Sequence, residues 1–153
     1  MQDKQRKLRQ LDAAMRLRAL QREKAELGHG RARRALGDAE RLLRDEQARY
    51  ASILAKAQQQ VGSGVLLDPF LHEQRLLTQL VAHSQVQEHA QHVASARSEH
   101  QQAMQALLKS KVDEDVAGKA HGRVADELLQ YARGQEQIDI ADAQQAQGGA
   151  RGL

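Results

Sequence analysis

Cysteine and tryptophan are absent from the 153-residue sequence, proline occurs once, and aromatic residues make up only 2% of the chain. Without cysteine, disulfides and thiolate metal sites are excluded, which fits a reducing compartment such as the cytoplasm. Because globular domains of this length fill much of their core with aromatic side chains, their scarcity argues against a compact core. With a single proline, the chain can run in very long helices.

Long hydrophobic runs are also missing. No stretch approaches the ~18 apolar residues that a membrane-spanning helix needs, so we expect no membrane insertion. The first ten residues are charged and lack the apolar segment of a secretory signal peptide. Ala, Leu, Arg, Gln and Glu are abundant, all of them strong helix formers, and this composition is typical of long helices and coiled coils.

Residues 62–69 form the one clear break in the helical pattern. Gly62 and Gly64 end the first helix, because glycine adopts the left-handed backbone of a helix terminus at little cost. Asp68 and Pro69 have the residue types of an N-cap and of the first position of the next helix. Because the connection is short, the second helix should fold back antiparallel to the first.

These boundaries predict one coiled-coil domain over residues 1–146. Its first helix covers about 2–61 and its second about 70–146. The glycine-containing residues 147–153 are expected to be a disordered tail.

A heptad repeat runs through the first helix without a slip. Eleven of its sixteen a and d positions are apolar, which predicts the seam of a coiled coil. The a positions are Leu8, Met15, Arg22, His29, Leu36, Leu43, Tyr50 and Ala57, and the d positions are Leu11, Arg18, Ala25, Ala32, Ala39, Glu46, Ile53 and Gln60.

The second helix carries a matching repeat from Val86 onward, with ten apolar residues in sixteen seam positions. Nearer the turn, Phe70, Leu77 and Val81 follow a different phase, which predicts a stutter in the repeat. The a positions are Val86, Val93, His100, Leu107, Glu114, His121, Leu128 and Gln135, and the d positions are His89, Ala96, Ala103, Ser110, Ala117, Val124, Tyr131 and Ile138.

Facing residues of an antiparallel pair have numbers with a constant sum, and 132 gives the best layers. Leu36 then faces Ala96, so that a large side chain meets a small one, and Arg18 faces Glu114. The next allowed sum, 125, would place charged residues against leucines. The predicted fold is therefore all-α, a long antiparallel two-helix coiled-coil hairpin, in which the second helix extends beyond the start of the first.

Charge is unevenly distributed along the chain. Residues 1–34 have 11 Lys and Arg against 4 Asp and Glu, a net charge of +7, whereas residues 109–153 have 6 against 8, a net charge of −2. The basic start is either a solvated face or a docking end for an acidic partner. No nucleic-acid motif or aromatic stacking platform accompanies it, so nucleic acid is not the expected ligand.

A second apolar stripe, Leu17, Leu20 and Leu27, lies off the seam of the first helix and predicts a second neighbour. At the turn, Tyr50 and Phe70 either fill the core where the helices separate or form an exposed binding patch. The glycines inside both helices mark either local bending or tolerated surface positions.

No catalytic signature is present, so we expect neither an enzyme nor a bound cofactor. The seven histidines do not form a zinc-binding motif, and Gly28-His29-Gly30 lacks the strand and spacing of a phosphate-binding loop. A two-helix coil also offers no concave, water-excluding pocket for catalysis.

The whole pattern resembles the type III secretion stalk proteins, the FliJ, YscO and HrpO (SctO) family. The similarity consists of the Arg/Leu/Ala-rich start, with Leu8-Arg9-Gln10-Leu11 and Leu20-Gln21-Arg22-Glu23, the short turn, and a Glu/Gln/Arg-rich second helix ending near Ile138-Asp139. It implies a monomeric hairpin at the cytoplasmic face of a secretion apparatus, where it would couple a hexameric export ATPase to the export gate and bind secretion chaperones.

The resemblance also implies two contact regions. The gate would be contacted by residues near the turn, namely Leu43, Tyr50, Phe70 and Leu77. The ATPase would be contacted at the end that holds both termini, by Arg6, Lys7, Arg9, Arg16, Leu128 and Tyr131. Two other functions stay open on sequence grounds: a coiled-coil scaffold or adaptor without a motor partner, and a basic binder of polyanions or membrane surfaces.

Overall fold

A computed structural model describes residues 2–62 and 68–151, and these form two helices, α1 (Gln2–Gly62) and α2 (Pro69–Arg151). No described residue lies in a β-strand. The all-α two-helix hairpin predicted from the sequence is confirmed, and α1 ends within one residue of its expected boundary. Most of the predicted turn, residues 63–67, lies outside the described residues.

The start of α2 is fixed by Asp68, as its residue type predicts. The backbone N–H of Phe70 donates to Asp68 Oδ1 at 3.1 Å, and the N–H of His72 donates to the Asp68 carbonyl at 3.0 Å. These bonds satisfy N–H groups that the first turn of a helix leaves without an internal partner. Pro69, which has no N–H to satisfy, occupies the first helical position.

The far end of α2 corrects one expectation. The helix continues to Arg151, so the disordered tail predicted over residues 147–153 is wrong for residues 147–151; residues 152–153 are not described. Gly148 and Gly149 each cost about 1 kcal/mol against alanine. Extending an existing helix adds a hydrogen bond per residue, and residues 70–151 contain no proline that would interrupt it.

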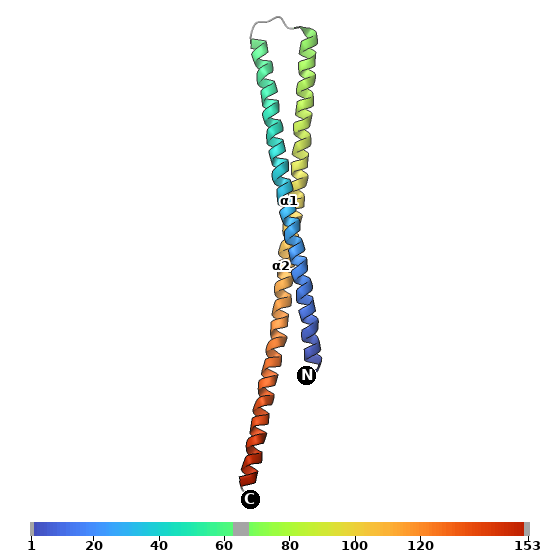
Figure 1. The fold of residues 1–153 in the computed structure, drawn as a ribbon. Helices are drawn as coiled ribbons and strands as arrows, with labels where there is room; N and C mark the ends of the chain where they lie inside the picture. Colours follow the sequence, from blue (N-terminus) through green and yellow to red (C-terminus); the bar gives the residue numbers. More distant parts are fainter. Residues whose placement is uncertain (1, 63–67, 152–153) are drawn as a thin grey trace. The chain divides into compact units, whose positions relative to one another are not determined.

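Contacts divide the chain into two compact units, each built from a segment of both helices. The first unit combines the chain up to Lys24 with the chain from Leu108 onward, and the second unit runs from Ala25 to Leu107. In each unit the two segments run side by side in opposite directions (Figure 1).

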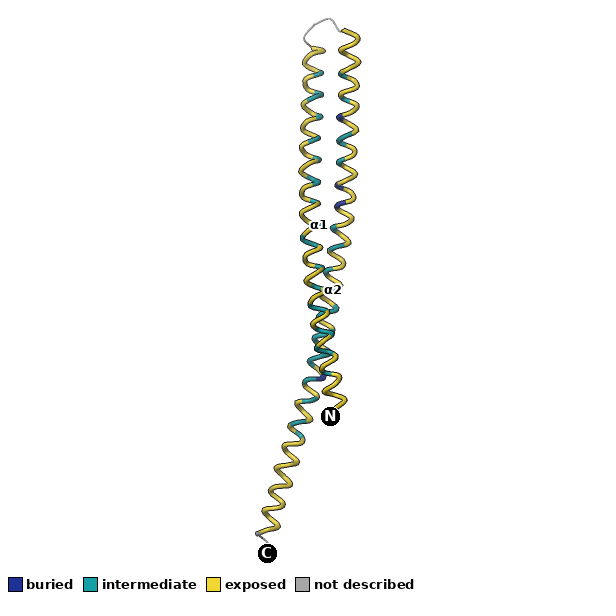
Figure 2. The backbone as a smooth tube through the Cα atoms, turned by 45° about the vertical axis from the view of Figure 1, so that its right-hand side comes forward, coloured by how far each residue is buried: buried dark blue, intermediate teal, exposed yellow. Residues whose placement is uncertain are grey.

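The seam lies on the a and d positions that the sequence predicts. In α1, fifteen of the sixteen predicted positions are half-buried and only Gln60 is exposed, although no residue of this helix is fully buried. In α2, every predicted position from Val86 to Leu128 is at least half-buried. Among the described residues, the buried ones are Ala82, Val93, Ala96 and Val124, all on α2. Figure 2 shows the buried and half-buried positions of the paired segments on the side of each helix that faces the other.

Near the turn the predicted stutter is wrong. The seam of α2 continues in the same phase through Ala82, Gln79 and Arg75, which are buried or half-buried. Phe70, Leu77 and Val81, the apolar residues that suggested a shifted phase, are instead exposed. Because no residue is inserted in the heptad repeat, its phase stays constant, and these apolar residues lie outside the seam.

The facing pairs agree with the predicted register. The rings of Tyr50 and His83 lie 5.6 Å apart, and Asp12 and His121 approach to 4.0 Å. Both pairs of residue numbers add to 133, and the other contacts between the helices, among them His29 with His100 and Arg22 with Glu114, add to between 129 and 137. These sums centre near the predicted 132, and all of them exceed the alternative of 125. The contacts therefore support the register in which the sequence pairs large residues with small ones.

The buried strip should carry much of the stability. Val93 is 4% exposed, and its change to alanine removes two methyl groups from the seam. We expect the free energy of unfolding to fall by about 1–2 kcal/mol, measured by chemical denaturation with far-UV circular dichroism.

The matched control is Val81→Ala in the same unit, where the side chain is 57% exposed. Alanine is the better helix former, so this change should leave the stability unchanged or raise it by about 0.5 kcal/mol. Equal losses for the two variants would contradict the assignment of Val93 to the seam.

Candidate interaction surfaces

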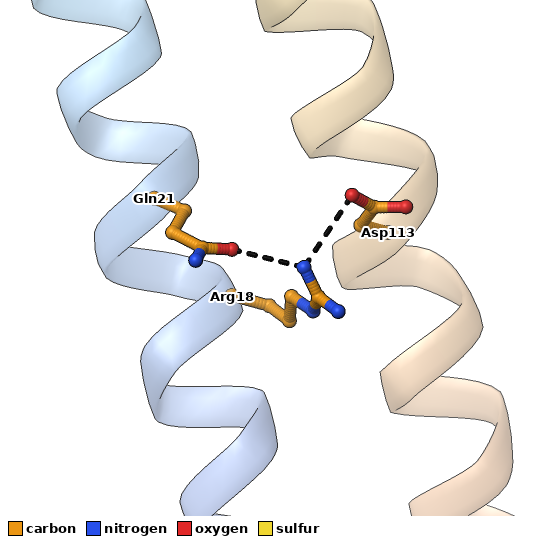
Figure 3. Close-up of polar contacts among 3 residues, drawn as sticks. All are labelled: Arg18, Gln21 and Asp113. Atoms are coloured by element: carbon orange, nitrogen blue, oxygen red, sulfur yellow. Dashed lines mark hydrogen bonds and ion pairs between the residues drawn. The ribbon is translucent and has the colours of Figure 1, made fainter.

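Ion pairs join the helices within the first unit, and two of them involve arginines of the α1 seam. The Arg18 guanidinium lies 3.5 Å from Asp113 Oδ2 and also donates to Gln21 Oε1 at 3.1 Å (Figure 3). Arg22 pairs with Glu114 in a closer contact, and their side chains are 27% and 33% exposed. The predicted pairing of Arg18 with Glu114 is therefore wrong by one position on α2, because a long arginine side chain reaches past its own layer.

The basic residues expected to contact an ATPase lie on the surface of the first unit. Arg6, Lys7, Arg9 and Arg16 are all exposed. Arg16 pairs with Asp12 on its own helix at 3.1 Å. An exposed pair of this kind contributes little to stability, so these charges are available to a ligand without loss of the fold.

The final part of α2 in the first unit has no facing segment of α1 (Figure 2). Leu128 is half-buried, whereas Tyr131 and Ile138, the next apolar seam residues, are 46% and 56% exposed. The helix thus continues past the start of α1 with its seam face open to solvent. Among the ATPase-end residues expected from the sequence, Tyr131 is the exposed apolar one.

The second apolar stripe of α1 is exposed throughout. Leu17 and Leu20 belong to the first unit and Leu27 to the second, and all three point away from the seam. Exposed leucines on a helix that is already paired are a feature of surfaces that contact other proteins. Their role as a contact stays a prediction.

The four residues expected to form one contact near the turn fall into two groups. Leu43 and Tyr50 are half-buried seam residues, and the Tyr50 ring packs against His83. Phe70 and Leu77 are 64% and 55% exposed on α2. Of the two interpretations left open by the sequence, filling of the core fits Tyr50, and an exposed patch fits Phe70.

Sequence reasoning missed a groove next to the turn, in the second unit, which we name the turn-side groove. It consists of two hollows of about 310 and 260 Å³ that share Ile53 and Thr78 in their walls. Its walls also contain apolar Leu71, Leu77 and Val81 and basic Arg49, Lys56 and Arg75. The available signal was the seam itself, since Arg75 and Gln79 occupy positions where a coiled coil requires apolar residues.

No arrangement suited to a metal ion is found among the described residues. The His29 and His100 rings lie 5.0 Å apart across the seam, and His89 and His92 lie 5.9 Å apart on α2. No group of three or more His, Asp or Glu side chains gathers within residues 2–62 and 68–151. In the same residues, neither helix has an apolar stretch long enough to cross a membrane.

Comparison with known proteins adds no relative: no protein family, curated protein or solved structure matches the chain.

The pairing of Arg22 with Glu114 can be tested by exchanging the charges. Arg22→Glu places two carboxylates together in a half-buried layer, and we expect a loss of about 1–2 kcal/mol of unfolding free energy, between the values for exposed and buried pairs. Combining Arg22→Glu with Glu114→Arg should recover most of the lost unfolding free energy, which denaturant titration measures.

The control for this exchange is Arg16→Glu, because Arg16 is exposed and its partner Asp12 lies on the same helix. Its effect should stay below about 0.5 kcal/mol. If the double exchange were no more stable than Arg22→Glu alone, the two residues would not face each other.

Proposed function

We propose that the chain is the central stalk of a type III secretion export ATPase. In this role it lies at the cytoplasmic face of a secretion apparatus, couples the hexameric ATPase to the export gate, and binds secretion chaperones. The resemblance of the sequence to the stalk family supports the proposal, and so does the two-helix hairpin, the fold which that family is expected to have.

The observation that carries the proposal is the unpaired end of α2 in the first unit. A stalk must place part of itself inside the central pore of a ring of subunits. Inside the pore, a single helix with exposed apolar residues can bury those residues against the subunits of the ring. Tyr131, at the level where α1 begins, and Ile138, beyond it, supply such exposed residues, and the basic start of α1 lies in the same unit.

The chemistry of the surface also favours a protein partner. Exposed apolar residues gain free energy when a partner removes them from water, and aromatic residues are frequent anchors of interfaces. The exposed cations at the start of α1 would steer an acidic surface toward this end of the molecule. We therefore assign Arg6, Lys7, Arg9, Arg16, Leu128 and Tyr131 to the ATPase contact.

The test is the activity of the cognate hexameric ATPase in the presence of the chain. We expect stimulation of ATP hydrolysis by the unaltered protein. Changing Tyr131 and Ile138 together to serine should raise the concentration of the chain that gives half-maximal stimulation by about tenfold or more, because two interface anchors are lost. Both side chains are exposed, so the fold should be retained.

Val112→Ser in the first unit is the control, because this exposed valine lies on the paired part of α2. It should stimulate like the unaltered chain. Sedimentation should give the mass of a monomer. A concentration-dependent dimer without any stimulation would contradict the stalk function and favour the scaffold.

A further inference from the structure

We propose that the turn-side groove of the second unit binds an amphipathic α-helix of a partner protein, one whose apolar stripe is flanked by acidic residues. The inference does not depend on the stalk function. It rests on the walls of the groove, on its unfilled volume and on the sign of the charges around it.

The groove is continuous and has the length of a short helix. Its two hollows share Ile53 and Thr78, and together their walls extend from Arg49 to Gln60 on α1 and from Leu71 to Gln85 on α2. At 1.5 Å per residue, each wall is roughly 17–21 Å long. A ligand helix of about three to four turns would match it.

The hollows exist because the seam is poorly filled at this end. Arg75 and Gln79 take seam positions on α2, and they face a part of α1 where Ala57 provides only a small side chain. Protein interiors tolerate few voids larger than a water molecule, because atoms lining a void lose dispersion contacts. A third helix is an element of the right size and direction to fill a groove between two others.

The apolar part of the groove is already placed to receive such a helix. Leu77 and Val81, one turn apart on α2, line one hollow, and Leu71 lines the other. All three are exposed, while Ile53 forms part of the wall of both hollows. A docked helix would remove these side chains from water, with a gain of about 25 cal/mol for each Å² of apolar area buried.

The charges that line the groove indicate that the ligand is negatively charged. Arg49, Lys56 and Arg75 line it, and no acidic residue does. Arg49 reaches Glu46 at 3.9 Å, whereas Lys56 and Arg75 have no ion pair with another described residue. Acidic residues beside the apolar stripe of the ligand would complement these cations and orient the helix. A concave groove with an apolar wall suits a helix better than the flat surface of a membrane.

The absence of cysteine allows a direct test with the full chain. Thr78→Cys, labelled with an environment-sensitive fluorophore, places a reporter in both hollows, and Ser98→Cys places one on an exposed position outside them. The probe is a synthetic 15-residue helical peptide with leucines at i, i+3 and i+4 spacing flanked by glutamates. We expect a saturable signal at position 78 and none at position 98.

A matched peptide with lysine in place of every glutamate should bind at least about tenfold more weakly than the acidic peptide. The acidic peptide should likewise bind the variant Lys56→Glu/Arg75→Glu at least about tenfold more weakly than the unaltered chain. The control variant Arg44→Glu/Lys109→Glu changes the net charge equally at exposed positions outside the groove and should bind like the unaltered chain. Leu71→Ser/Leu77→Ser should also weaken binding by about tenfold.

Circular dichroism verifies the helix content of each variant, and Lys56→Glu alone replaces the pair if Arg75→Glu unfolds the protein. Equal binding of the acidic and basic peptides would overturn the proposal. So would equal binding to the groove and control variants. Self-association abolished by Lys56→Glu would also overturn it, since the occupant would then be a second copy of the chain.

Discussion

The interlocking of small and large side chains along one seam is the interaction on which the rest of this structure depends. Few aromatic residues are available, and the buried residues of the described part of the chain are two alanines and two valines. Each layer contributes little area, so stability has to come from the repetition of many similar layers. This explains why the heptad continues through α1 and through α2 as far as Leu128 without an inserted residue.

Polar residues interrupt the apolar seam in a few layers, and these layers differ between the two units. In the first unit, Arg18 and Arg22 find carboxylates on α2, so the charged layers favour one register over its neighbours. In the second unit, His29 and His100 face each other, and His29 Nε2 is buried without a hydrogen-bond partner. Such polar layers stabilise the fold less than apolar layers do, but they specify the register of the two helices more strictly.

Much of the fold could be predicted because both signals are local. Asp68 and Pro69 define the start of α2 by their chemistry, and the heptad positions define the seam by their spacing. The sequence failed where residue type and position disagree. Phe70, Leu77 and Val81 are apolar and were therefore expected in a seam, yet the unbroken helical phase leaves them outside.

The interaction surfaces were only partly predictable for a related reason. The exposed basic residues and Tyr131 follow from composition and from the length difference between the helices. The turn-side groove depends on how two helices separate around Arg75 and Gln79, which is a property of packing between distant segments. The partner of Arg18 also depends on side-chain reach, which heptad spacing does not describe.

The narrowness of the seam has a consequence for the evolution of such a chain. The fold constrains about two positions in every seven, and these need only alternate in size. The other five can exchange freely among helix-forming residues without loss of the hairpin. Selection by binding partners therefore acts on most of the sequence, and hairpins descended from one ancestor can keep their shape while their surfaces diverge.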